Sequence, residues 1–144
     1  MKNFLWIVPD SWLPLLNAHG GVAACYSIPI SLSPDAEQLA GATLYILQRS
    51  KTHDSVFARV EISSVDIAVD ETNAPIEILL NVCLEKSLRV LRDGNDIDAR
   101  DFWVNSFEGK PIGFSTLDSD SARRLESIIR KGFKILFTHV PESI

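Results

Sequence analysis

Short apolar runs separated by turn-forming residues dominate this chain, and the pattern predicts many short strands. The clearest period-two alternation covers residues 56–65, and a second covers residues 76–84. Compact apolar runs predict further strands at 4–8, 22–26, 43–49 and 133–138. Residues 87–91 fit a strand or a helix equally well, and a short return strand is expected through Phe114.

The strongest helix signal lies at residues 118–131. Asp118 is a favourable N-cap, and Gly132 stands where a helix C′ residue is expected. Between them, apolar residues recur at helical spacing: Ala122, Leu125, Ile128 and Ile129. Weaker signals predict short helices after Ser11 and after Ser33, the second with Pro34 at its first position.

The chain of 144 residues has the size of one ordinary domain, so we expect residues 1–144 to form a single unit. Strands outnumber helices, and no strand–helix–strand alternation suggests a doubly wound sheet. The pattern therefore predicts an α+β fold in which about five to seven strands curl into a barrel-like sheet with two or three short helices.

The formal net charge of -5 lowers the expectation of strong non-specific binding to nucleic acid, which needs a basic face. Cys25 and Cys83 both sit in apolar runs, which predicts small buried thiols. Sparse cysteine fits a reducing compartment, and no apolar run is long enough to span a membrane. We therefore expect a cytoplasmic protein that does not bind membranes.

No pattern predicts a metal or a cofactor, because His19, His53 and His139 lie far apart and no paired cysteine motif is present. One acidic cluster could supply the paired carboxylates of a hydrolase. It consists of Asp93, Asp96, Asp98 and Asp101. A solvated turn is the simpler interpretation of that cluster, since charged runs are mostly exposed.

The aromatic residues have two interpretations. Aromatic side chains most often fill the core, and that is the simpler view of Trp6, Trp12 and Trp103. A nucleotide base can also stack on an aromatic face for about 1–3 kcal/mol without needing a basic surface. An acidic protein could therefore hold a single flipped base in an aromatic pocket.

Five segments together resemble the EVE branch of the PUA-like superfamily, relatives of the ASCH and YTH domains. They are Phe4–Trp12, Gly21–Ser27, Leu39–Leu47, Val56–Ile62 and Phe107–Leu117. The resemblance implies a PUA-like mixed β-barrel and a non-catalytic module that binds a modified base in DNA or RNA. The chain departs from the family's pattern at two places. Ala23 and Ala24 stand where the family often has an aromatic residue, and Gly41 is followed by Ala42 where the family usually has an aspartate.

The same resemblance implies a ligand site near the ends of the early strands. Its candidate residues are Trp6, Trp12, Tyr26, Ser27, Arg49, Ser50, Trp103 and Phe114. The acidic charge and the missing aromatic keep a second hypothesis open, in which the fold serves a regulatory contact with another protein. A hydrolase that uses the Asp93–Asp101 cluster is the third hypothesis. The sequence does not indicate an oligomeric state.

Overall fold

The computed structural model describes residues 2–9, 24–29, 38–50, 54–91, 97–98, 113–130 and 134–137. These residues form a nine-stranded sheet, one α-helix and a short 3-10 helix. The elements are β1 (Asn3–Pro9), β2 (Cys25–Pro29), β3 (Thr43–Arg49), β4 (Asp54–Val69), β5 (Pro75–Val82), η5 (Leu84–Lys86), β6 (Leu88–Leu91), β7 (Ile97–Asp98), β8 (Gly113–Thr116), α2 (Ser119–Arg130) and β9 (Lys134–Phe137).

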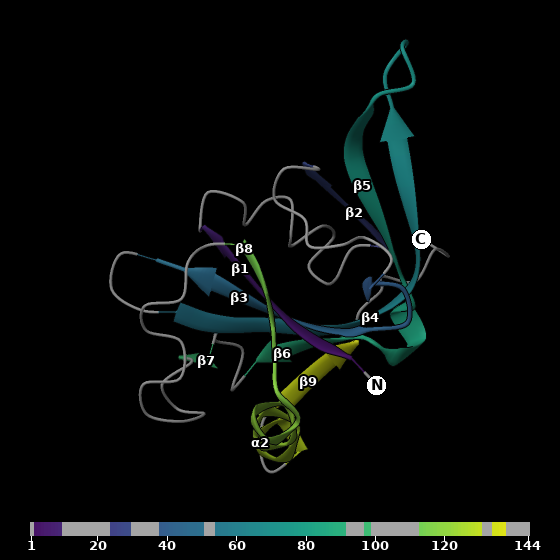
Figure 1. Ribbon diagram of the computed structural model, residues 1–144. Coiled ribbons are helices and arrows are strands. Elements are labelled where there is room, and N and C mark those ends of the chain that lie inside the picture. Colours follow the sequence, from purple (N-terminus) through teal and green to yellow (C-terminus); the bar gives the residue numbers. More distant parts are fainter. Residues whose placement is uncertain are drawn as a thin grey trace, which may run out of the picture.

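The main path of the sheet has the strand order β2-β5-β4-β3-β1-β8 (Figure 1). β1 and β3 pair in parallel, with Trp6 beside Ile46, and the other pairs are antiparallel. β6 and β7 pair with the first half of β4, and β9 extends β6. β4 therefore joins the part of the sheet that contains β3, β6 and β7 to the part that contains β5 and β2.

The predicted α+β barrel with two or three helices is wrong, because the sheet is open and the described residues hold one α-helix. The physical reason lies in β4, whose 16 residues exceed the length of its partner β3. Its first half pairs with β3 and its second half pairs with β5, so the sheet extends outward. Within the described residues no pairing joins the edge strands β2 and β8, as closure would require.

Most strand predictions are confirmed, with shifts at the ends. β2 begins at Cys25, three residues later than expected, and β4 continues four residues beyond Val65. The ambiguous 87–91 segment is a strand, because Leu88–Leu91 pairs with β9 and partly with β4. β7 was not predicted. The helices expected after Ser11 and Ser33 lie outside the described residues.

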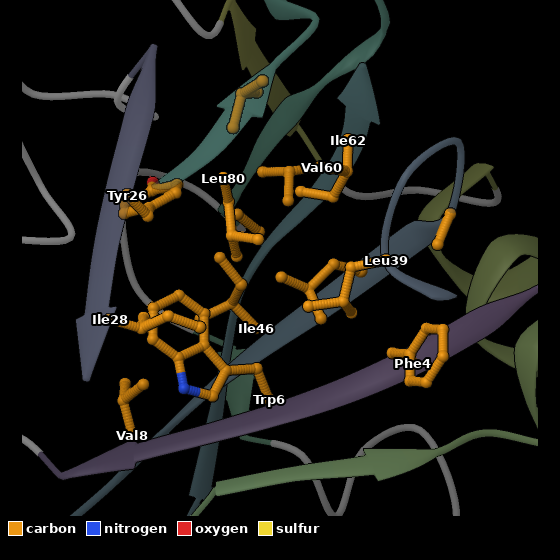
Figure 2. Close-up of a cluster of buried hydrophobic side chains, with 14 of the residues drawn as sticks. Phe4, Trp6, Val8, Tyr26, Ile28, Leu39, Ile46, Val60, Ile62 and Leu80 are labelled. Carbon is orange, nitrogen blue, oxygen red and sulfur yellow. The ribbon is translucent and has the colours of Figure 1, made fainter. Parts of the chain in front are cut away.

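The sheet buries apolar side chains on both faces because its strands alternate. The first core cluster includes Phe4, Trp6, Val8, Tyr26 and Ile28, and Figure 2 shows Trp6 lying among its apolar neighbours. The second cluster joins the opposite face to α2 through Leu5, Ile7, Tyr45, Leu47, Val56, Val90, Leu117, Ala122, Leu125 and Ile129. α2 therefore covers one face only.

Asp118 is the N-cap of α2, as predicted. Its Oδ2 accepts the backbone N–H of Ser121 at 3.1 Å, and its Oδ1 accepts the Ser121 hydroxyl at 2.6 Å. These hydrogen bonds, the hydroxyl bond first, lower the pKa of Asp118 from its usual value of 3.8. The carboxylate is therefore stabilised in the folded state.

Replacing Asp118 with alanine should lower the thermal midpoint at pH 7, because the first turn of α2 loses its cap. A depressed folded pKa contributes stability above the unfolded value, and that contribution disappears as the pH falls through the folded value. The wild-type advantage over Asp118→Ala should therefore shrink below about pH 4. Thermal melts of both proteins between pH 2 and pH 7 measure the difference in thermal midpoint. A difference independent of pH would contradict the role of the ionised carboxylate.

Candidate binding site

Three predicted site residues from three strands form an aromatic cluster in the structure. The rings of Trp6 and Phe114 stack with centroids 5.0 Å apart and planes 9° apart. Tyr26 meets Trp6 edge-on, at 5.7 Å and 78°. Both geometries are favourable for aromatic pairs. The cluster therefore joins β8, β1 and β2 through side chains far apart in the sequence.

Sheet register explains why these rings meet. Trp6 lies directly across from Phe114 in the antiparallel β1–β8 pair, on the same face of β1 as Phe4 and Val8. Trp6 is 2% exposed and Tyr26 4%, whereas Phe114 is half-buried at the edge of the sheet. Trp6 and Tyr26 are thus part of the core, and of these three rings only Phe114 offers surface to a ligand.

The polar members of the predicted site lie away from this cluster. Ser27 follows Tyr26 on β2, so it points to the opposite face, where its hydroxyl donates to Glu77 Oε2 at 2.7 Å. Arg49 ends β3 and binds Asp54 through two hydrogen bonds, at 2.8 and 3.0 Å. The bond to Asp54 raises the pKa of Arg49, so the guanidinium stays charged and is engaged within the sheet. Ser50 is half-buried just beyond it.

Some expectations concern residues outside the described part. Trp12 and Trp103 lie there, as do Asp93, Asp96 and Asp101 of the acidic cluster. For Asp98 only the backbone is described, in β7. The site prediction can therefore be followed for Trp6, Tyr26, Ser27, Arg49, Ser50 and Phe114.

The sequence argument missed Gln48, a polar residue on the face of the aromatic cluster. It lies beside Val8 in the β1–β3 pair and shares its face of β3 with Leu44 and Ile46. Its Oε1 is buried, and no hydrogen-bond donor reaches it from the part of the chain that the structure describes. The signal was present in the sequence as a single amide in the inward-facing series Leu44, Ile46 and Gln48.

A polar group on the other face links the sheet to α2. Tyr45 donates its phenol hydrogen to Glu126 Oε1 at 2.7 Å, and Arg59 Nη1 binds Glu126 Oε2 at 2.6 Å. Burial, followed by the hydrogen bond to Glu126, raises the pKa of Tyr45 well above its usual range. The phenol is therefore protonated at neutral pH and acts as a structural donor.

Arg89 is buried beneath the sheet surface, at 5% exposure. Its guanidinium lies 3.9 Å from the centroid of the Phe57 ring, and Nη1 donates to the carbonyls of Phe57 and Val90. Backbone carbonyls and a ring face thus accommodate this charge. This role in the core makes Arg89 an unsuitable partner for a phosphate.

Cys25 contradicts the expectation of two buried thiols, since it is exposed, while Cys83 is half-buried; both are free. Cys25 alternates with the inward-facing Tyr26, which explains its exposure. Partial burial, and secondarily Asp66, raises the pKa of the Cys25 thiol, which disfavours the reactive thiolate. Among the described residues, no group of histidine, cysteine and carboxylate side chains could hold a metal ion.

Comparisons with known proteins define the fold. No protein-family model matches the chain, and no curated protein matches its sequence. The structure resembles a crystal structure of a mutant of ZmASCH from Zymomonas mobilis, with a TM-score of 0.55 and 9% identity. The match covers 88% of this chain and 96% of that one. The protein therefore shares the fold of that ASCH protein. The described part contains no helix that could span a membrane.

Proposed function

We propose that this protein is a non-catalytic module that binds a single base of RNA or DNA, and that a modified base is its preferred ligand. The observation that carries the proposal is the stack of Phe114 on Trp6 at the edge of the sheet, with 5.0 Å between the centroids. The PUA-like fold supports it.

Phe114 and Trp6 have different parts in this proposal. Phe114 is half-buried and supplies the stacking surface, whereas Trp6 is buried and holds the Phe114 ring in place from behind. A base stacked on one aromatic ring gains about 1–3 kcal/mol regardless of its sequence context. Such stacking also suits a protein with net charge -5, since it depends little on phosphate contacts.

Gln48 supplies a polar contact in the proposed site. A buried carbonyl oxygen without a donor loses hydrogen-bonding free energy, and an exocyclic amine of a base would satisfy it. β1 lies between Phe114 on β8 and Gln48 on β3, so both residues flank the same strand. A ring face and a hydrogen-bond acceptor are the two elements that base recognition combines.

Fluorescence anisotropy tests the proposal with labelled single-stranded oligonucleotides. Each carries one 5-methylcytosine or N6-methyladenine, and each is compared with its unmodified counterpart in DNA and in RNA. We expect at least one modified strand to bind roughly tenfold more tightly, a difference of about 1.4 kcal/mol. Absent binding, or equal binding to all strands, would refute base recognition.

Two leucine variants locate the site. Phe114→Leu should weaken binding about tenfold, because leucine cannot stack on a base as a ring does. Phe57→Leu is the matched control, since it removes a buried ring that packs under Arg89. Equal losses in the two variants would assign the effect to stability instead of stacking.

Replacing Gln48 with methionine should change stability and binding in opposite directions. Removing a buried acceptor that lacks a donor should raise the free energy of unfolding by about 1 kcal/mol. The same change should weaken binding of the preferred oligonucleotide several-fold, because its amine loses an acceptor. Urea denaturation and anisotropy measure the two effects, and a loss of both stability and binding would indicate a purely structural amide.

A further inference from the structure

The second half of β4 and most of β5 form a hairpin arm whose tip extends beyond the rest of the sheet (Figure 1). β2 pairs with the outer edge of β5 from Glu77 to Asn81, so only the tip of the arm is two-stranded. We define the arm as residues 63–80, with its turn at Asp70–Ala74. The turn is closed by Asp70, whose backbone N–H donates to the Ala74 carbonyl and whose Oδ1 accepts from Thr72 and Ala74. The arm is therefore an ordered hairpin.

One face of the arm is an apolar strip that continues from the core into solvent. Val65, Ile67 and Val69 share this face of β4, and across the pairing Val65 lies beside Leu80 and Ile67 beside Ile78. β2 pairs with β5 beside the base of the strip, where Leu80 and Ile78 are buried. At the tip, Ile67, Val69 and Ile76 are 50%, 48% and 46% exposed.

Within the described residues, the arm also has an unpaired strand edge. Asp70 directs its backbone N–H toward β5, so by alternation Ala68 and Asp66 face β5 as well. The backbone groups of Val65, Ile67 and Val69 consequently point away from β5. In the described part of the chain, β5 is the only strand paired with this half of β4. An open edge beside apolar side chains is a ready template for an added strand.

Charge selects the kind of partner. The arm contains four carboxylates, Asp66, Asp70, Glu71 and Glu77, and no lysine, arginine or histidine. A second copy of the chain would bring like charges together, and a phosphate backbone or an anionic membrane would be repelled. A segment with lysine or arginine between apolar residues complements both the acidic groups and the apolar strip.

We propose that the β4–β5 arm is a docking site for an extended, basic segment of another protein, which adds as a strand to the open edge of β4. Backbone hydrogen bonds to Val65, Ile67 and Val69 supply affinity, as in other strand-addition complexes. Apolar side chains of the partner cover Ile67 and Val69, and its basic side chains approach Glu71. Val65, Ile67 and Val69 do not belong to the aromatic cluster, so the edge of β4 serves a partner other than the proposed base.

The probe is a synthetic, fluorescently labelled nine-residue peptide of alternating lysine and valine. Its binding to the full chain is measured by fluorescence anisotropy. Its controls replace every lysine with glutamate, or place proline at two central positions. We expect binding of the lysine peptide alone, weakening as salt rises from 50 to 500 mM because screening lengths shorten. Equal binding of the glutamate or proline peptide would overturn the proposal.

Variants of the arm test the same geometry. Ile67→Pro removes an outward-facing N–H and should abolish peptide binding, whereas Ile67→Thr with Val69→Thr keeps the backbone and should weaken it about tenfold. Glu71→Lys should weaken it several-fold, and the matched reversal Glu85→Lys, in η5 beyond the base of the arm, should not. Wild-type affinity in all three arm variants, or sedimentation showing an arm-dependent dimer that excludes the peptide, would refute the proposal.

Discussion

Replacing Trp6 with alanine is expected to lower the free energy of unfolding by about 4 kcal/mol, as full truncation of a buried aromatic typically does. Trp6 is 2% exposed and contacts two further rings, Phe114 and Tyr26. Its loss would leave a cavity where β1, β2 and β8 meet, because packed side chains relax only partly into such space. Urea denaturation followed by far-UV circular dichroism measures the change.

Trp6→Phe separates packing from ligand contact. Phenylalanine keeps a ring against Phe114, so we expect less than half the loss of stability and little change in oligonucleotide affinity. Thr116→Ala, at an exposed position of the same β1–β8 pair, is the surface control and should stay within about 0.5 kcal/mol of wild type. A Trp6→Ala loss below about 1 kcal/mol would contradict a buried, stacked indole.

Local sequence signals predicted the elements whose formation depends on residues close together in the chain. The apolar run at residues 4–8 and the alternation at 56–65 both lie in strands, and Asp118 caps its helix as expected. Each of these signals depends on side chains within one turn or one strand. None of these signals depends on which strand pairs with which.

Pairing between distant segments was the part that local signals could not supply. Whether β4 closes a barrel or extends into an arm depends on where its pairing with β3 stops and its pairing with β5 begins. These points lie at Thr43, opposite Glu61, and at Val82, opposite Ile62, both about 20 residues away along the chain. Alternation past Val65 continues with Ile67 and Val69, which the predicted strand at residues 56–65 did not include. The parallel pairing of β1 with β3 likewise depends on a long connection.

In the candidate site too, local signals were informative and contacts between distant residues could not be predicted from them. The resemblance grouped Trp6, Tyr26 and Phe114 in one candidate site, and in the structure the Trp6 ring contacts both of the other rings. Ser27 was grouped with its neighbour Tyr26, although adjacent residues of a strand point to opposite faces. Gln48 was missed because a single amide in an apolar strand becomes significant only when its lack of a donor is known.

Replacing Glu126 with alanine is expected to lower the free energy of unfolding by about 3 kcal/mol, the scale for breaking a largely buried ion pair. Its carboxylate is the acceptor for both Tyr45 and Arg59, whose side chains come from neighbouring strands under α2. Arg59 is only 19% exposed, and its Nε is already buried with no acceptor among the described residues. Removal of the carboxylate therefore leaves a charge and a phenol with unmet hydrogen bonds.

Tyr45→Phe isolates the phenol bond and supplies a pH test. The variant should lose about 1–2 kcal/mol at pH 7, and its effect should not add to that of Glu126→Ala, because both remove the same bond. The folded pKa of Tyr45 is raised, so its contribution is complete below the usual value of 10.0 and declines as the pH rises beyond it. Wild type should lose its advantage over Tyr45→Phe in urea denaturation at pH 11–12, whereas additive effects or an advantage independent of pH would show that Glu126 and Tyr45 stabilise the α2 contact separately.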